Sequence, residues 1–114
     1  MRVTSELWVS ALVRRVFSDG GFAAVRRKGA REAGAIFILH RTRIGELELY
    51  SPAPQTSYDA ARPGERQFVS VLVTGEEEEV EKRLARELRF DPDVWVVEVE
   101  TAAELSGYLT LVSD

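Results

Sequence analysis

The sequence predicts an α+β fold in which two helices pack against an antiparallel sheet of about four to five strands. One apolar segment near the N-terminus and one amphipathic segment before Pro92 have helical spacing, and short strand-like runs separated by turn residues fill the rest. Consecutive strands joined by short turns favour antiparallel pairing, while the second helix could support a crossover. With 114 residues and a mass of 12.8 kDa, we expect one domain over residues 1–114.

The first helix is predicted over residues 7–17. Apolar residues cover most of its circumference when they are plotted at helical spacing, so we expect a helix that is buried on most sides. Thr4 or Ser5 can cap its start. Gly20 and Gly21 follow it, and glycine readily takes the left-handed conformation that ends helices.

Five short segments have strand character. Residues 33–40 are apolar on both faces, which is typical of a central strand. Residues 47–50, with Glu46 and Glu48 facing outward, are predicted at an edge, and residues 51–64 form one long loop. The predicted strands are residues 22–27, 33–40, 47–50, 67–73 and 94–100.

The second helix has the clearest pattern of the chain. Val80, Leu84 and Leu88 form an apolar stripe at i, i+4 and i+8, and Thr74 with Glu77 fits a capping box. The helix is expected to stop before Pro92, because proline disfavours helical geometry in the preceding residue. The segment after residue 101 has no clear pattern.

Composition excludes several classes of protein. The chain is 45% hydrophobic and 30% charged, as in an ordinary soluble globular protein. It has no cysteine, which excludes disulfide scaffolds, thiolate metal sites and cysteine nucleophiles, and it has one histidine, His40. No apolar run approaches the roughly 20 residues of a membrane span, and no signal peptide is evident. We therefore expect a cytoplasmic protein that does not enter a membrane and has no cofactor.

Charge is divided unevenly along the chain. Residues 1–45 contain nine Arg or Lys and three Asp or Glu, whereas residues 46–114 contain six and sixteen, giving +6 and −10. A basic surface could bind an anionic partner such as nucleic acid. The division is also explained by two halves, or two chains, that fold against each other, and we favour this interpretation because nucleic-acid-binding domains are usually basic overall.

The best candidate for chemistry is the group of carboxylates formed by Asp91-Pro92-Asp93 with Glu98 and Glu100 downstream, to which Arg14 or Arg15 could be added. Clustered carboxylates can hold Mg²⁺ or act as paired acid and base. Asp91-Pro92-Asp93 is also a typical helix-to-strand turn whose side chains cap backbone amides, and we favour that reading. The candidate residues are Arg14, Arg15, Asp91, Asp93 and Glu98.

One specific contact is predicted within this set. Arg15 lies at the edge of the apolar arc of the first helix, beside Trp8. Its guanidinium should seek a carboxylate, and Glu98 on the last strand is the expected partner.

Other polar groups carry weaker predictions. The acidic run 76–79 complements the dipole at a helix N-terminus. Arg26, Arg27, Lys28 and Arg31 could cradle phosphate at a hairpin tip, and His40 could serve as a ligand or base. No P-loop, dinucleotide-binding, serine-hydrolase or zinc-helix motif is present in the sequence.

Three function classes follow. We favour a non-enzymatic domain that binds another protein or a second copy of itself as a homodimer. The first alternative is a small enzyme or ligand-binding protein that uses the Arg and carboxylate cluster. The second alternative, and the less favoured, is nucleic-acid binding through the basic N-terminal half.

Several segments, taken together, are similar to one small protein family. They are residues 5–11 with Arg14 and Arg15, then residues 32–35, 49–55, 84–86 and 89–100. On these segments the chain resembles a proteobacterial family known only as a domain of unknown function, family 1491. The resemblance covers residues 1–101 and leaves residues 102–114 as a tail of uncertain structure. It implies a compact single domain and supplies no activity and no functional residue.

Overall fold

The computed structural model describes residues 3–54, 57, 59 and 64–113, and these form two α-helices and a six-stranded sheet. A short 3-10 helix, η2 (Leu105–Gly107), precedes the last strand. The main elements are α1 (Ser5–Ser18), β1 (Phe22–Arg27), β2 (Ile36–Arg41), β3 (Leu47–Pro52), β4 (Gln67–Thr74), α2 (Glu77–Phe90), β5 (Trp95–Glu100) and β6 (Thr110–Leu111).

The sheet is mixed, with strand order β1-β5-β2-β3-β4-β6. The β2–β5 and β4–β6 pairs are parallel, and the other pairs are antiparallel. The prediction of a purely antiparallel sheet of four to five strands was therefore wrong in two respects. The connection through α2 returns the chain to the middle of the sheet, where β5 enters parallel to β2, and the tail adds β6. Ser51 and Pro52 of the predicted loop 51–64 belong to β3, so the loop starts later than predicted, and residues 55, 56, 58 and 60–63 of it lie outside the described residues.

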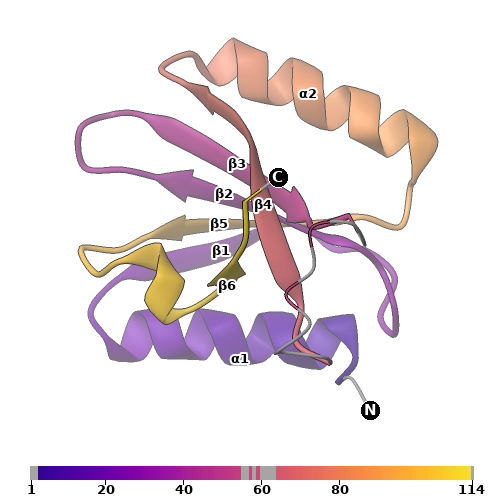
Figure 1. Ribbon diagram of the computed structural model, residues 1–114, viewed down its shortest axis with the longest axis horizontal. Coiled ribbons are helices and arrows are strands. Elements are labelled where there is room, and N and C mark those ends of the chain that lie inside the picture. Colours follow the sequence, from indigo (N-terminus) through magenta and orange to yellow (C-terminus); the bar gives the residue numbers. More distant parts are fainter. Residues whose placement is uncertain (1–2, 55–56, 58, 60–63, 114) are drawn as a thin grey trace.

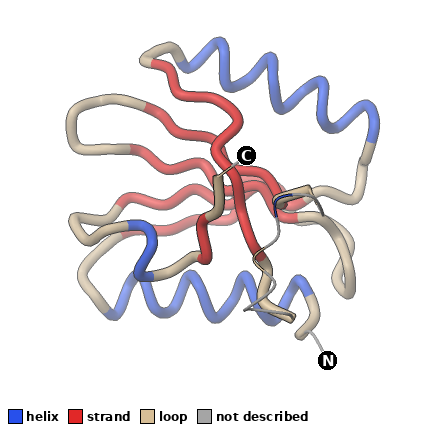
Figure 2. The backbone as a smooth tube through the Cα atoms, in the orientation of Figure 1, coloured by secondary structure: helices blue, strands red, loops and turns tan. Residues whose placement is uncertain are grey.

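The two helices cover opposite faces of the sheet (Figures 1 and 2). Side chains alternate along β5, so Trp95, Val97 and Val99 belong to the core under α1, while Val94 and Val96 belong to the core under α2. β2 is buried on both faces, which confirms the central position predicted for it. β3 lies between β2 and β4, so its predicted edge position was wrong.

The N-terminal cap predicted from the sequence is present in α1 and absent from α2. Thr4 caps α1, because its hydroxyl accepts a hydrogen bond from the N–H of Leu7, and Gly20 just beyond the helix has a φ of 86°. The predicted capping box of α2 was wrong. The N-cap of α2 is Glu76, which makes no side-chain cap bond, and the Thr74 hydroxyl accepts the N–H of Glu76 instead.

α1 is less buried than its sequence predicts. One stripe of the helix faces the sheet and is buried, with Val9, Leu12 and Val16 at its centre. Leu7 and Phe17 point away from the sheet and are 59% and 50% exposed. The sequence predicted burial on most sides, and no described part of the chain covers the outer side of α1.

A charged network holds α2 above the sheet. Glu98 lies on the α2 face of β5 with 16% of its side chain exposed, and its Oε2 accepts a hydrogen bond from Nε of Arg41 at 2.8 Å. Arg41 also pairs with Glu77 of α2, and Arg26 of β1 pairs with Glu81 of α2 and, at 3.8 Å, with Glu98. These carboxylates raise the pKa of Arg41, with Glu77 the larger cause, and Arg41 lowers the pKa of Glu77. The network connects three strands to one helix.

Glu98→Gln should destabilise the protein by about 1–3 kcal/mol. The change leaves the two half-buried arginines facing each other without the carboxylate between them. Urea unfolding followed by circular dichroism measures this difference. Glu78→Gln removes a partner of Lys82 in a pair whose side chains are both more than 75% exposed, and should change stability by less than about 0.5 kcal/mol. Equal effects of the two substitutions would contradict the assignment.

Candidate functional site

The five residues predicted as a cluster do not converge. Arg14 and Arg15 lie on α1, on one side of the sheet, and Glu98 faces α2 on the other side. Asp91 and Asp93 lie in the turn between α2 and β5.

The predicted ion pair between Arg15 and Glu98 was wrong. Glu98 lies between Val97 and Val99, which face α1, so its own side chain must point to the opposite face. The Arg15 guanidinium instead donates a hydrogen bond to the carbonyl of Gly107 at 2.7 Å and lies 5.3 Å from the ring centre of Tyr108. Arg15 therefore holds the tail segment against α1.

Asp91-Pro92-Asp93 is a structural turn, as favoured from the sequence. The Asp91 carboxylate accepts the backbone N–H of Asp93 at 3.0 Å, and Arg27 donates to the carbonyl of Pro92. The carbonyl of Asp93 accepts the N–H of Ala30. A Cβ on Gly34 would stand 2.4 Å from that same carbonyl oxygen, which leaves no room for a side chain. Asp93 therefore stabilises the turn through its backbone carbonyl, which contacts Ala30 and Gly34.

Gly34→Ala should therefore destabilise the protein by about 2 kcal/mol or more, because a methyl group must displace the backbone at Asp93. Asp93→Ala keeps the backbone and should cost less than about 0.5 kcal/mol. Thermal unfolding of the two variants beside the parent chain provides the comparison. A larger effect at Asp93 than at Gly34 would show that its carboxylate matters.

The basic run predicted as a phosphate cradle is engaged within the chain. Arg26 and Arg27 bind the acidic network and the carbonyl of Pro92. Lys28 and Arg31 both pair with Glu6, at 3.5 and 3.1 Å, and this pairing lowers the pKa of Glu6 with Arg31 as the main cause. Four cations with internal partners do not form a free phosphate site.

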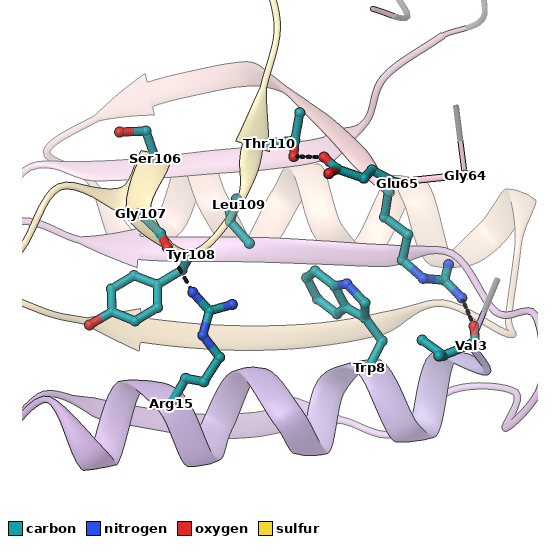
Figure 3. A pocket seen from close by; sticks show the side chains of 11 residues that line it. Val3, Trp8, Arg15, Gly64, Glu65, Ser106, Gly107, Tyr108, Leu109 and Thr110 are labelled. Carbon is teal, nitrogen blue, oxygen red and sulfur yellow. Dashed lines mark hydrogen bonds between the residues drawn. The ribbon is translucent and has the colours of Figure 1, made fainter. Parts of the chain in front are cut away.

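A hollow of about 440 Å³ lies between α1 and the tail (Figure 3). Trp8 and Arg15 project into it from α1, and Tyr108 faces them from the segment after η2. Thr110 donates to the Glu65 carboxylate at 2.6 Å, and Arg66 donates to the carbonyl of Val3. The polar groups around the hollow bond largely to other parts of the chain. Their hydrogen bonds attach the tail to α1 and to the start of β4.

A second hollow, of about 360 Å³, lies on the same face of the sheet, beside the tail segment. His40 of β2 and Glu48 of β3 stand opposite each other across the strand pair, and His40 Nδ1 is 2.9 Å from Glu48 Oε1. The Tyr50 hydroxyl donates to the same oxygen at 3.2 Å. Burial, with the nearby Glu48 charge as the smaller cause, raises the pKa of Tyr50 to about 12.

The sequence analysis considered His40 alone and did not predict its contact with Glu48 and Tyr50. The available signal was the hairpin turn at residues 42–46, which places positions 40 and 48 opposite each other. The prediction that Glu48 faces outward was wrong, because the tail segment covers this end of β3.

The raised pKa of Tyr50 predicts that stability falls as the pH rises from about 10 to about 12. In the unfolded chain the phenol loses its proton near pH 10, whereas in the folded chain it holds the proton until about 12. Within this window the unfolded chain binds fewer protons and is favoured, by up to about 2–3 kcal/mol. Urea unfolding at several pH values should show a smaller decline for Tyr50→Phe than for the parent chain. Identical declines would contradict the prediction.

Besides the two hollows, α1 and the edge strand β1 together form an exposed apolar surface. Phe22 and Val25 of β1 are 46% and 43% exposed, and Phe22 packs edge-to-face against Phe17. A groove of about 430 Å³ runs between α1 and β1. It is lined by Glu6, Val9, Ser10, Val13, Arg14, Val25, Lys28 and Trp95.

Comparison with known proteins places the chain in a family. A family model described as "Protein of unknown function (DUF1491)" matches residues 3–107. The chain belongs to the DUF1491 family. The match extends past residue 101, where the resemblance seen in the sequence ended, and so includes the first part of the tail.

Solved structures similar to this DUF1491 protein include three from two bacteria. The solution structure of protein Atu0922 from A. tumefaciens is 52% identical, with a TM-score of 0.83, and the match covers 100% of this chain and 98% of that chain. A crystal structure of a DUF1491 family protein from Caulobacter crescentus CB15 is 35% identical, with a TM-score of 0.71 and coverage of 88% and 87%. An NMR structure of a DUF1491 family protein from the same organism is 32% identical, with a TM-score of 0.75 and coverage of 100% and 98%. No protein with a curated description matches the sequence.

In the described part of the chain, no helix has the length and apolar character needed to cross a bilayer. The same part of the chain has no group of three or more His, Cys, Asp or Glu side chains placed to hold a metal ion.

Proposed function

We propose that this DUF1491 protein is a self-associating interaction domain in which β1 of one copy pairs antiparallel with β1 of a second copy. The observation that carries the proposal is that a free strand edge and exposed apolar side chains of the neighbouring helix lie together. The proposed location is the cytoplasm, as expected from the sequence.

The edge of β1 is available for pairing. β1 is the first strand in the sheet order and bonds to β5 along one side, and no other described strand bonds to its second side. A β-bulge between Val25 and Arg27 ends the regular part of the strand. Bulges limit edge pairing, so the segment that a second strand can follow is Phe22 to Val25.

The flanking helix supplies apolar surface to the same contact. Phe17, Phe22 and Val25 are all between 40% and 50% exposed, and the first two form an aromatic pair that links α1 to the strand. The groove between α1 and β1 continues this surface with Val13. Exposed apolar patches of this kind mark interaction sites on soluble proteins.

Charge favours a second copy in the antiparallel direction. The cations at positions 26–28 follow the apolar half of β1. In an antiparallel pair centred on Ala24, Ala23 of each copy comes opposite Val25 of the other, and the cationic ends of the two strands lie far apart. Parallel pairing would place the cations side by side. One two-fold contact thus joins the same surface of both copies.

Val25→Lys should weaken dimer formation at least about ten-fold, because a charge would enter the centre of the contact. Sedimentation equilibrium over a range of protein concentrations measures the dimer dissociation constant. Phe17→Lys tests the helix side of the same surface and should have the same direction of effect.

Val73→Lys is the matched control, since Val73 is 52% exposed and lies on β4, away from β1. It should leave the dissociation constant within about two-fold of the parent value. A parent chain that is monomeric at high micromolar concentration, or an equal effect of the control, would overturn the proposal.

A further inference from the structure

The groove between α1 and β1 has an apolar interior. Val9 and Val13 of α1 line one side, Val25 of β1 lines the other, and Trp95 of β5, which is 2% exposed, contributes to the floor. The volume of about 430 Å³ is in the range of small-molecule sites. An occupant of the groove must therefore be largely apolar.

The charges at one end of the groove are engaged with one another. Glu6 lies at this end, and its carboxylate pairs with Lys28 at 3.5 Å and with Arg31 at 3.1 Å. The hydrogen bond from Arg31 is the main cause that lowers the pKa of Glu6, so this carboxylate stays ionised at neutral pH. Lys28 and Arg31 therefore already have an anionic partner within the chain.

Arg14 supplies a cation farther along the groove. It is exposed, and its guanidinium has no hydrogen bond or ion pair to any residue in the described part of the chain. Ser10 lies one helical turn earlier on the same side of α1, so the two side chains are neighbours. From Glu6 to Arg14 the helix advances by about 12 Å. An apolar run of this length therefore leads away from an unpaired guanidinium.

We propose that this groove binds a medium-chain alkyl carboxylate, the chemistry of a free fatty acid. The carboxylate accepts hydrogen bonds from the Arg14 guanidinium, whose planar fork matches the two carboxylate oxygens, and it lies beside the Ser10 hydroxyl. The alkyl chain extends past Val13 and Val25 toward the Glu6 end. An alkyl ammonium ion would meet Arg14 with like charge, and a short carboxylate would leave the apolar walls uncovered.

This assignment goes beyond self-association and does not depend on it. The groove shares Val13 and Val25 with the surface proposed for the contact between two copies, so a bound carboxylate should compete with a second copy. A chain that forms no dimer would still bind the carboxylate. A chain that binds no carboxylate could still form the dimer, so the two proposals fail separately.

The two tryptophans of the chain provide a reporter and an internal control. Trp95 lines the groove, and its indole N–H donates to the carbonyl of Ala30, whereas Trp8 lines the hollow beside the tail (Figure 3). Proton–nitrogen NMR spectra of isotope-labelled protein show one indole N–H signal for each tryptophan. The signal that is lost in Trp8→Phe belongs to Trp8.

The probe is sodium octanoate at about pH 7, where its carboxylate is ionised. Octylammonium chloride, which has the same chain and the opposite charge, and sodium acetate, which has the charge without the chain, are the matched controls. We expect a saturable shift of the Trp95 indole signal with octanoate alone, and no comparable shift at Trp8. An equal shift with octylammonium or with acetate, or no saturable shift with octanoate, overturns the proposal.

Variants separate the head-group contact from general charge effects. Arg14→Gln should weaken octanoate binding at least about five-fold, because it removes the charged donor. Arg43→Gln makes the same change at an exposed arginine between β2 and β3 that does not line the groove, and should stay within about two-fold. Arg14→Lys keeps the charge and should bind more tightly than Arg14→Gln. Equal losses at positions 14 and 43 contradict the assignment.

The length of the ligand tests the apolar part of the groove. Lengthening the probe from hexanoate to octanoate adds two CH₂ groups and should raise the affinity at least about four-fold, because these groups leave water for the valine walls. The same indole titration measures both dissociation constants. An affinity that does not change with chain length would show that the carboxylate binds Arg14 without entering the groove, and would overturn the proposal.

Discussion

The position of β5 between β1 and β2 is the constraint on which the rest of the structure depends. This strand bonds along both of its edges, antiparallel to β1 and parallel to β2. Its side chains point alternately to the two faces of the sheet, so the apolar residues of this one strand pack in the core under α1 and in the core under α2. A strand buried on both faces needs apolar residues at almost every position, and Glu98 is the polar exception before the exposed Glu100 at the end of the strand. The ion pairs of Glu98 replace apolar packing between α2 and the sheet at that point.

The network around Glu98 also explains the uneven charge of the sequence. Arg26 and Arg41 belong to the basic first part of the chain, and Glu77, Glu81 and Glu98 belong to the acidic second part. Folding brings these opposite charges together within one molecule. The interpretation that the two halves fold against each other therefore accounts for part of the division without an anionic partner.

Local patterns predicted the elements well and their arrangement poorly. The strand at residues 22–27 and the helix that follows Thr4 agree with the structure, because periodicity and capping depend on neighbouring residues. The order of strands depends on contacts between residues far apart, and no local signal shows that β5 inserts beside β2. The prediction of an Arg15–Glu98 ion pair was wrong for the same reason. The local sequence around either residue does not show which face of the sheet α1 covers. The His40–Glu48 contact was within reach, because a hairpin turn fixes its own register.

The late position of β5 in the chain has a consequence for biosynthesis. β1 is made early, yet its partner in the sheet is complete only at Glu100. Until then the strands β2, β3 and β4 can form an antiparallel meander, whereas α1 and β1 have no completed sheet to pack on. Contacts that span this much sequence slow folding and keep apolar surface exposed for longer. The N-terminal helix and strand of this protein therefore reach their final position after most of the chain has left the ribosome.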